Sequence, residues 1–365
     1  MARTFRGLLA NLSLAFASFL AFFLILEAGI RLYSGVPVFA TTNFVIQALD
    51  IIRVNSGAMV FDDVLGWRLK DDVGTPGSGF LTSQYGIRTN GIRRSPALPK
   101  GAVIAVGDSF TAGSGVRDEE TFPAQLEKLV GIPVINGAAG AWSVDQMVLR
   151  AEMLAETASP SAVIVGIMVH DTLRNGFDLF GGGYKPWFKL VDGKAILQGI
   201  PVRRFEKEPV NLGLRRRIFG HSWLVHWSMT RLGYLDRWVL DAYRYRSVMS
   251  EQQAVAVSCG LMSRLRALQD RYGSKVIVLM LWGAVDMELP ERRWFGPPVL
   301  ECARQAGLET LDLYPVLYGL SKADKKRFES LWIDEGGVLG HPSAEGHALT
   351  ARLLNEHFFS DRRAN

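Results

Sequence analysis

The stretch VIAVGDSFTAGSG, residues 103–115, decides the fold, because an unbroken apolar run ends there in small and acidic residues. Such a run is typical of a strand buried on both faces, as in a parallel sheet covered by helices. The strand would deliver Gly107, Asp108 and Ser109 to the carboxyl edge of the sheet, where open α/β folds bind ligands. Ser109 is therefore the first candidate for chemistry, although a serine after a strand is also a favoured helix cap.

Residues 101–172 and 251–360 continue this pattern, with short apolar segments alternating with segments of helical periodicity. The predicted strands are residues 102–106, 133–136, 162–168, 275–282 and 309–313. The predicted helices are residues 122–130, 144–155, 251–272, 298–306 and 344–358. Five strands separated by helices predict an α/β fold with a parallel sheet covered on both faces.

The amino-terminal segment, residues 1–35, is predicted to be a cytoplasmic tip and a transmembrane anchor. No charged residue lies between Arg6 and Glu27, which leaves about 20 residues, the length that spans a bilayer. The apolar run is longer than that of a secretory signal, and no small-x-small cleavage site follows it, so an uncleaved anchor is favoured over a removed signal peptide. Arg3 and Arg6 favour a cytoplasmic amino end and an exported body. The predicted location is the bacterial inner membrane, with the body in the periplasm or extracytoplasmic space.

Net charge, cysteine content and motif spacing limit the classes of partner and cofactor that this chain is expected to bind. The 365-residue chain carries a net charge of +5, which fits a protein beside an anionic membrane surface better than a nucleic-acid binder, because no aromatic-basic repeat or zinc spacing occurs. Cys259 and Cys302 either pair in an oxidising compartment or are buried free thiols. No metal is expected, since no H-E-x-x-H or paired-cysteine spacing is present, and no cofactor, since GDSFTAGSG lacks the lysine of a phosphate loop.

Two regions depart from the alternation of strands and helices. Residues 36–100 are irregular and rich in glycine, and are predicted to be an arm packed on the core. Residues 173–250 are predicted to be an insertion, with a hairpin at Asp192-Gly193 followed by basic, aromatic helices that contain Trp223, Trp227 and Arg231. These helices either lie on the membrane surface beside the anchor or form an amphipathic cover over the active site.

A serine nucleophile requires a base, and a histidine is the first choice. His341 lies in DEGGVLGHPSAEGH, after the last predicted strand and before a final helix that Ser343 is expected to cap. His347, in the first turn of that helix, is expected to be a packing or capping residue. The remaining histidines apart from His170 have helical, aromatic surroundings and are expected to be structural or surface residues: His221, His226 and His357.

The serine motif is not a nucleophile elbow, because GDSFT lacks a glycine two residues after the serine. Several features together resemble the SGNH (GDSL) hydrolase family of esterases and acyltransferases: VGDSFTAG, an N-x-G-like loop after the second strand, a polar residue after the third, and HPSAEGH near the end. LGWRLK and SQYGIRTNGI look like the segment that precedes the core in membrane-anchored bacterial members. The resemblance covers residues 60–172 and 250–358. It implies a three-layer, flavodoxin-like fold with about five parallel strands, to which the anchor and an inserted subdomain are added.

The resemblance also implies site residues. Ser109 would be the nucleophile and would give its backbone N–H to the oxyanion hole. Ala138 falls where the family has a glycine that supplies the second N–H, with Gly137 and Gly140 as alternatives. His170 falls where the family has an asparagine that supplies the third donor, and an imidazole N–H is able to replace that amide.

The acid that orients His341 is displaced relative to the family pattern, in which an aspartate stands three residues before the histidine. Val338 holds that position, and the nearest acids are Asp334 and Glu335. Asp334 is expected to reach the imidazole through the flexible loop, with a Ser-His dyad as the alternative. Asp108 is expected to hold the turn rather than to transfer protons.

These inferences predict a membrane-anchored serine ester hydrolase or O-acyltransferase that acts on acyl esters through an acyl-Ser109 intermediate. The expected substrates are acyl esters of a cell-envelope polysaccharide or, second, of a lipid. A membrane-protein partner is a further candidate. The alternative is a catalytically weakened SGNH-like binding or scaffold protein of a cell-envelope complex. Ala138, His170 and Val338, which depart from the family pattern, favour that alternative.

Overall fold

The computed structural model describes residues 2–47, 57–75, 77–91, 97–180, 183–204, 212–234, 238–239, 246–289 and 294–360. The chain divides into two compact units: Met1–Val54 with Glu206–Arg244, and Asn55–Phe205 with Tyr245–Asn365. The boundaries differ from those expected at residues 36 and 173, because the arm and the insertion are each split between the two units. The first half of the insertion and most of the arm belong with the core.

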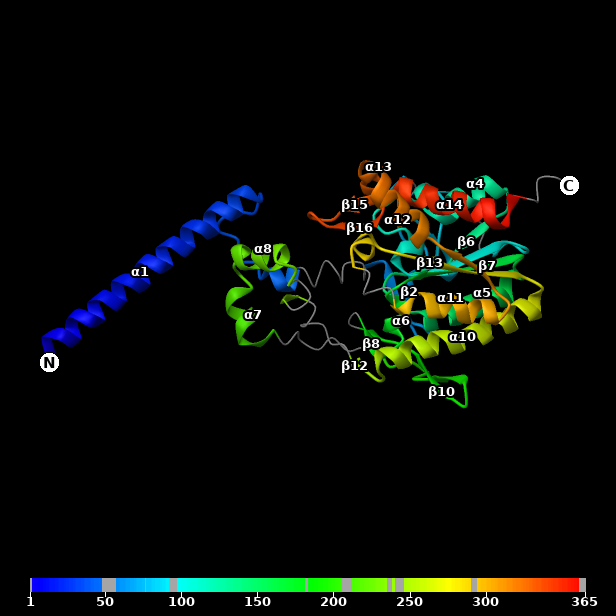
Figure 1. Ribbon diagram of the computed structural model, residues 1–365, viewed down its shortest axis with the longest axis horizontal. Coiled ribbons are helices and arrows are strands. Elements are labelled where there is room, and N and C mark those ends of the chain that lie inside the picture. Colours follow the sequence, from blue (N-terminus) through cyan, green and yellow to red (C-terminus); the bar gives the residue numbers. More distant parts are fainter. Residues whose placement is uncertain are drawn as a thin grey trace. The chain divides into compact units, whose positions relative to one another are not determined.

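The second unit is built on a seven-stranded sheet in the order β14-β13-β7-β5-β6-β4-β3 (Figure 1). Five strands are parallel: β5 (Val103–Gly107), β6 (Val134–Asn136), β7 (Ala162–Met168), β13 (Lys275–Leu281) and β14 (Glu309–Asp312). Numbered along the chain, these strands lie in the order 2-1-3-4-5, the flavodoxin-like arrangement. The prediction of an α/β fold with about five parallel strands is confirmed.

Two strands of the arm extend the sheet in the antiparallel sense. β4 (Ile87–Arg88) pairs with β6, and β3 (Thr82–Ser83) pairs with β4. The sequence did not predict these strands, because two-residue segments carry no readable periodicity. Their pairing places the arm directly on the core.

Helices cover both faces of the sheet (Figure 1). α4 (Phe122–Val130) and α14 (Ala344–Phe358) pack on one another over one face. α5 (Val144–Ala158), α10 (Glu251–Tyr272) and α11 (Pro297–Gln305) pack together over the other. The strands between them are almost wholly buried, which is why they read as unbroken apolar runs in the sequence.

The predicted bounds of strands and helices agree with the structure to within three residues. The cause is visible at the helix ends. The side chains of Thr121 and Ser250 accept backbone N–H groups at the starts of α4 and α10. Gly131 and Gly273 end these helices with φ of 71° and 62°, a conformation that glycine adopts without strain.

The remaining elements of the second unit are short. The paired strands are β1 (Met59–Asp62) and β2 (Gly66–Leu69), then β8 (Phe177–Phe180) with β9 (Gly183–Tyr184) and β12 (Arg246–Ser247), and β15 (Trp332–Asp334) with β16 (Leu339–Pro342). The short helices are α3 (Ser109–Ala112), α6 (Asp171–Arg174), α12 (Tyr314–Ala323) and α13 (Lys325–Ser330). The 3-10 turns are η2 (Gln84–Gly86), η3 (Asp118–Glu120) and η5 (Ala284–Met287).

The hairpin predicted at Asp192-Gly193 is confirmed. β10 (Trp187–Val191) and β11 (Lys194–Gln198) pair antiparallel on either side of these two residues. Asp192 and Gly193 have φ of 48° and 74°, as a two-residue turn of this kind requires.

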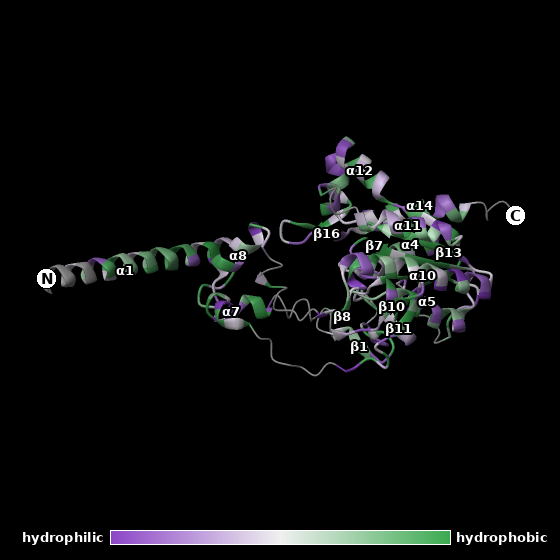
Figure 2. Cartoon of the chain, turned by 60° about the horizontal axis from the view of Figure 1, so that its bottom comes forward, coloured by the Kyte–Doolittle hydropathy of each residue, from purple (hydrophilic) through white to green (hydrophobic). Residues whose placement is uncertain are grey.

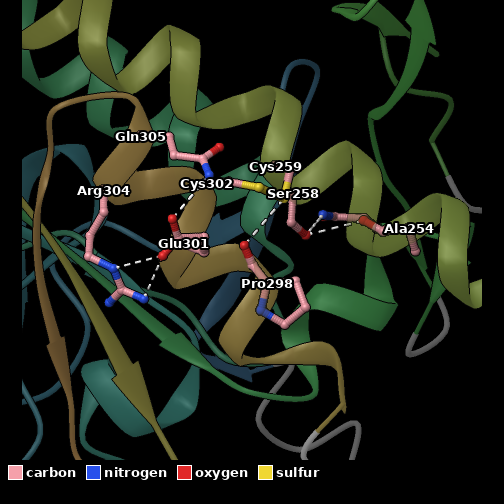
Figure 3. Close-up of a disulfide and its surroundings, with 9 residues drawn as sticks. Ala254, Ser258, Cys259, Pro298, Glu301, Cys302, Arg304 and Gln305 are labelled. Atoms are coloured by element: carbon pink, nitrogen blue, oxygen red, sulfur yellow. Dashed lines mark hydrogen bonds and ion pairs between the residues drawn. A yellow bond between two sulfur atoms is a disulfide. The ribbon is translucent and has the colours of Figure 1, made fainter.

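A disulfide joins Cys259 of α10 to Cys302 of α11 (Figure 3). The two Cα atoms lie 5.3 Å apart, a normal spacing for a disulfide. The sequence left pairing and free thiols open, and the structure has the pair. The bond ties together two helices that cover the same face of the sheet.

The first unit contains α1 (Ala2–Tyr33), α7 (Gly213–Phe219) and α8 (Trp223–Arg231). Within α1, Ala10–Tyr33 is long and apolar enough to cross a membrane, with a mean hydropathy of 2.1 (Figure 2). The unit has a small core of its own, formed by Val45, Leu212, Trp238 and Val239.

Candidate functional site

Ser109 is the first residue of α3, directly after the carboxyl end of β5. Asp108 caps this helix, since its Oδ1 accepts the N–H of Phe110 at 2.9 Å. Gly113 ends the helix with φ of 81°. Asp108 thus holds the turn that presents Ser109, as the sequence indicated.

The side chain of Thr111, in the GDSFT motif, packs against two glycines that have no Cβ atom to collide with it. Gly107 of β5 and Gly166 of β7 are register partners. A Cβ atom at either position would lie 2.1 or 2.3 Å from Thr111 Oγ1. The glycine before Asp108 is therefore required for packing, and it lets the helix that carries Ser109 sit against the strand ends.

His341 approaches Ser109 from β16, 232 positions later in the chain. Its Nε2 lies 2.9 Å from Ser109 Oγ. The ring of Phe110 lies 5.4 Å from the imidazole, between centroids, and supports it from one side. The structure thus brings together the two side chains that the sequence paired.

Glu335 completes this arrangement. Its Oε1 lies 2.6 Å from Nδ1 of His341. Gly340 makes room for the carboxylate, because a Cβ atom there would lie 2.3 Å from Glu335 Oε2. The imidazole is thereby placed with Nδ1–H toward the carboxylate and the Nε2 lone pair toward the serine hydroxyl.

The expectation that Asp334 orients His341 is wrong. Asp334 ends β15, and its Oδ1 accepts the N–H of Gly337 instead, which closes the loop. Neighbouring side chains of an extended chain point to opposite sides, so only one of the two adjacent acids is able to face His341. Glu335 is that residue, and its N–H is bonded to the carbonyl of Val338.

The loop after β6 lies beside Ser109 and contains the candidate oxyanion donors. The N–H of Gly137 is bonded to the carbonyl of Ala105, and that of Ala138 faces Asn136 Oδ1 at 3.4 Å. Gly140 lies near the nucleophile, since a Cβ atom there would be 3.9 Å from the Cβ of Ser109. The assignment of the second oxyanion donor among Gly137, Ala138 and Gly140 stays a prediction.

His170 lies after β7, where the family has an asparagine, and it is bonded to Asp286. Its Nε2 is 2.9 Å from Asp286 Oδ1. Asp286 is fully buried and also accepts the N–H of Gly283 at 2.8 Å. In the tautomer that donates Nε2–H to Asp286, the ring offers only an acceptor at Nδ1. A role for His170 as an oxyanion donor stays a prediction.

A cluster of charged side chains lies beneath the serine turn. Arg174 Nη1 bonds to Asp171 Oδ1 and lies 3.3 Å from Asp108 Oδ2. Burial, followed by the nearby charge of Asp108, raises the pKa of Asp171 well above its usual range. The arginine links the ends of β5 and β7.

The arm holds both loops that flank Ser109. Trp67 of β2 donates its Nε1–H to the carbonyl of Gly140 at 3.0 Å, and Trp142 Nε1 donates to the carbonyl of Trp67 at 2.9 Å. On the other side, Arg88 of β4 donates to the carbonyl of Ala112 at 2.6 Å. The arm therefore fixes the backbone around the nucleophile.

His347, in the first turn of α14, makes different contacts. His347 is buried, and its Nδ1 accepts the N–H of Phe122 at the start of α4, so it packs and caps as the sequence indicated. Burial, and then the charge of Arg88, lowers the pKa of His347 to about 3. Among the described residues, no group of three or more His, Cys, Asp or Glu side chains is arranged to hold a metal ion.

No family model matches this sequence, and no curated protein matches it. Among solved structures, a putative lipolytic protein of the G-D-S-L family from Desulfitobacterium hafniense is 17% identical, with a TM-score of 0.36 over 70% of this chain and 99% of that one. TesA is 14% identical, with a TM-score of 0.39 over 69% and 95% of the two chains. Axe2, an acetylxylan esterase from Geobacillus stearothermophilus, is 14% identical, with a TM-score of 0.38 over 72% and 96%.

These similar structures thus include a G-D-S-L lipolytic protein and an acetylxylan esterase. At these identities and TM-scores the chemistry of this chain has to be argued from its own residues. Those residues form a serine, histidine and glutamate relay at the carboxyl edge of a parallel sheet. Such a relay activates a hydroxyl for attack on a carbonyl carbon.

Proposed function

We propose that this chain is a serine ester hydrolase or O-acyltransferase that works through an acyl-Ser109 intermediate. The observation that carries the proposal is the pair of contacts on one imidazole. His341 Nε2 lies 2.9 Å from Ser109 Oγ, and Nδ1 lies 2.6 Å from Glu335 Oε1. A nucleophile, a base and an orienting acid within hydrogen-bond distance are the parts that nucleophilic acyl transfer needs.

The reaction follows from these contacts. Ser109 Oγ attacks the ester carbonyl while its proton moves to Nε2 of His341, and Glu335 stabilises the imidazolium that forms. The imidazolium then gives this proton to the departing alcohol, which leaves an acyl ester on Ser109. Water or an acceptor hydroxyl then loses a proton to His341 and attacks the acyl carbon. The bond between that carbon and Ser109 Oγ breaks, and His341 returns the proton to Oγ.

The negative oxygen of the tetrahedral intermediate needs hydrogen-bond donors. The backbone N–H of Ser109 is the first, and the N–H of Gly140 is the second in this proposal. Loss of one such donor typically costs about 3 kcal/mol of transition-state stabilisation, roughly a hundredfold in rate. An enzyme with His170 in place of the third donor would therefore be slower but still active.

The proposed location is the bacterial inner membrane, with the second unit in the periplasm. The apolar stretch of α1 that ends before Glu27 provides the candidate span, and Arg3 and Arg6 favour a cytoplasmic amino end. The Cys259–Cys302 disulfide supports an oxidising compartment for the body of the protein.

The proposed substrates are acyl esters of a cell-envelope glycan first and of a lipid second. The choice of a glycan follows from the family that the motifs resemble. It is supported by the openness of the site, since the side chains of His341 and Glu335 are 28% and 45% exposed. An ester carried on a polymer needs such an accessible serine.

A non-catalytic binding or scaffold protein of an envelope complex is the second candidate. Ala138 and His170 favour it, because both depart from the donors of the resembled family. The contacts of His341 with Ser109 and Glu335 weigh against it, since a scaffold needs no activated serine.

The test is hydrolysis of an aryl acetate by the full-length chain in detergent, compared with Ser109→Ala. Ser263→Ala, an exposed serine on α10, is the matched control. Hydrolysis that is lost in Ser109→Ala and retained in Ser263→Ala supports the proposal. Polyols or glycans are then added as acceptors. Formation of an acetylated acceptor indicates transfer, and formation of acetate alone indicates hydrolysis. Equal activity in all three proteins, or none in the parent with any aryl or glycan ester, would favour the scaffold.

A further inference from the structure

Glu27 is the first charged residue after the apolar stretch of α1. About 20 residues, Gly7 to Leu26, precede it without a charge. At 1.5 Å per residue these cover about 30 Å, the thickness of the hydrocarbon core of a bilayer. If α1 spans the membrane, as the proposed function holds, Glu27 lies at the boundary between hydrocarbon and headgroups.

The carboxylate of Glu27 is bonded to the start of α8. Ser222 Oγ–H donates to it at 2.7 Å, and the backbone N–H groups of Trp223 and Leu224 donate at 2.7 and 2.9 Å. A carboxylate at a helix amino terminus is favoured by the helix dipole. The first turn of α8 is thereby held at the depth of Glu27, beside the last turns of α1 (Figure 1).

Arg31, one turn further along α1, is 5% exposed. It holds the segment that follows α1 through hydrogen bonds to backbone carbonyls. Its guanidinium donates to the carbonyls of Pro37, Val38 and Ala40 at 2.9 to 3.1 Å, and to that of His221 at 2.6 Å. The exit from α1 therefore forms a fixed joint with the residues before α8 and does not lead into a free linker.

α7 is tied to the same joint. Asn43 Nδ2 donates to the carbonyl of Arg216 at 3.0 Å, and the N–H of Phe44 donates to that of Gly220 at 2.7 Å. Both α7 and α8 are thus held close to the end of α1, and their depth relative to the bilayer follows from that of Glu27.

Apolar side chains of α7 are left outside the small core of this unit. Leu214 and Ile218, one helical turn apart, are 75% and 58% exposed, and Phe219 is 47% exposed. Leu232, just after α8, is 68% exposed. Large apolar side chains gathered on one small unit mark an interaction surface. Exposed arginines lie among them: Arg215, Arg217 and Arg231.

We propose that α7 and α8 form a platform in the headgroup layer of the bilayer that α1 crosses. Leu214, Ile218 and Phe219 insert at the boundary with the acyl chains, and the arginines meet anionic headgroups. Of the two interpretations that the sequence left open, this is the membrane-surface one. The partner is the phospholipid bilayer itself, because the joint at Glu27 places these side chains at its boundary.

The test uses the full-length chain reconstituted in vesicles of phosphatidylglycerol and phosphatidylcholine with brominated acyl chains. A fluorophore is attached to an introduced thiol in Ile218→Cys, in Leu214→Cys or, as the control, in Val191→Cys, an exposed position of the hairpin in the second unit. The bromines should quench the probes at 214 and 218 at least about threefold more than the control.

Quenching at 214 and 218 that equals the control would overturn the platform, and so would probes that are shielded from water yet unquenched, since a protein would then cover α7. Alkaline carbonate extraction of the same samples separates this failure from that of the proposed anchor. A chain that stays in the vesicles while its probes are unquenched keeps the anchor and loses the platform. A chain that is extracted loses both.

Discussion

Two histidine-carboxylate pairs lie at the carboxyl edge of the sheet, and they use opposite ring nitrogens. His341 turns Nδ1 to Glu335 and keeps Nε2 for Ser109. His170 turns Nε2 to Asp286, which lies in η5, a turn that packs against the β16 strand carrying His341. Among the residues that the structure describes, the first pair is the one hydrogen-bonded to a hydroxyl, that of Ser109.

The two pairs also differ in burial. Glu335 is 45% exposed, whereas Asp286 is fully buried and accepts a backbone N–H as well. An exposed pair contributes little to stability, and a buried carboxylate that loses its partner is costly. The first pair is therefore the one that the proposed reaction uses, and the second links the ends of β7 and β13.

The largest expected effect is on the first pair. His341→Ala should lower the rate of aryl acetate hydrolysis by roughly 10⁵-fold, because the serine loses its base. The melting temperature should stay close to that of the parent, since both side chains of the pair are partly exposed. His357→Ala, an exposed histidine of α14, is the control for both measurements. A variant that keeps more than a tenth of the parent rate would break the comparison.

Replacing the acid should have the next largest effect. Glu335→Gln should lower kcat by about a hundredfold to a thousandfold, because the amide no longer stabilises the imidazolium, and a half-exposed acid contributes less than a buried one. Asp334→Asn, which alters the adjacent residue, is the matched control and should change kcat by less than about threefold. Steady-state kinetics of the two variants show which acid orients His341. A larger loss of kcat in Asp334→Asn than in Glu335→Gln would assign that role to Asp334.

The second pair should show the opposite balance. His170→Ala should lower the free energy of unfolding by about 2 kcal/mol, because Asp286 is left buried with one partner fewer. His170→Asn should recover part of this loss through its amide donor. Calorimetry measures both changes. Unchanged stability together with a large loss of activity would instead make His170 part of the catalytic machinery.

A third histidine, His347, should make the free energy of unfolding depend on pH. The pKa of His347 is lowered to about 3 in the folded chain, whereas the ordinary pKa of a histidine is about 6.5. Between these two pH values the unfolded chain binds a proton on His347 and the folded chain does not. This contribution to stability is complete above about pH 6.5 and is lost as the pH falls toward 3, at about 1.4 kcal/mol per pH unit.

His347→Asn should remove that part of the pH dependence while it keeps an acceptor for the N–H of Phe122. The check is denaturant unfolding of parent and variant between pH 4 and pH 7, values chosen to lie within this window. Parallel curves for the two proteins would show that His347 does not titrate as proposed.

The smallest expected effect concerns Trp67, a positioning residue for the loop that carries Gly140. Trp67→Phe removes the 3.0 Å hydrogen bond to the carbonyl of Gly140 and should lower kcat by about tenfold with KM unchanged, since the donor is needed most in the transition state. Trp294→Phe, at a residue 43% exposed, is the control. A rise in KM alone would place Trp67 in substrate binding.

Much of the fold was readable because its signals are local. Unbroken apolar runs such as residues 162–168 mark strands buried on both faces, and capping residues such as Ser250 and Gly273 mark the ends of helices. The two-residue strands of the arm gave no such signal, and neither did the division of the insertion between two units. Those features depend on long-range pairing.

The site was readable in part for the same reason. Ser109 stands out because it follows a strand at the start of a helix, and His341 because it lies two residues before Ser343, which caps the last helix. Glu335 was missed in favour of its neighbour, although the alternation of side chains at the end of β15 and the glycine at 340 were available signals. The contacts of Trp67, Arg88 and Asp286 arise from chain segments far apart in the sequence, which spacing alone does not reveal.

The central claim is that Ser109 is the activated nucleophile of this chain. Mass mapping of the full-length protein after reaction with a fluorophosphonate tests it most directly. We expect a single adduct, on the peptide that contains Ser109, and its loss in Ser109→Ala and in His341→Ala. An adduct on another residue, or labelling that persists in Ser109→Ala, would contradict it.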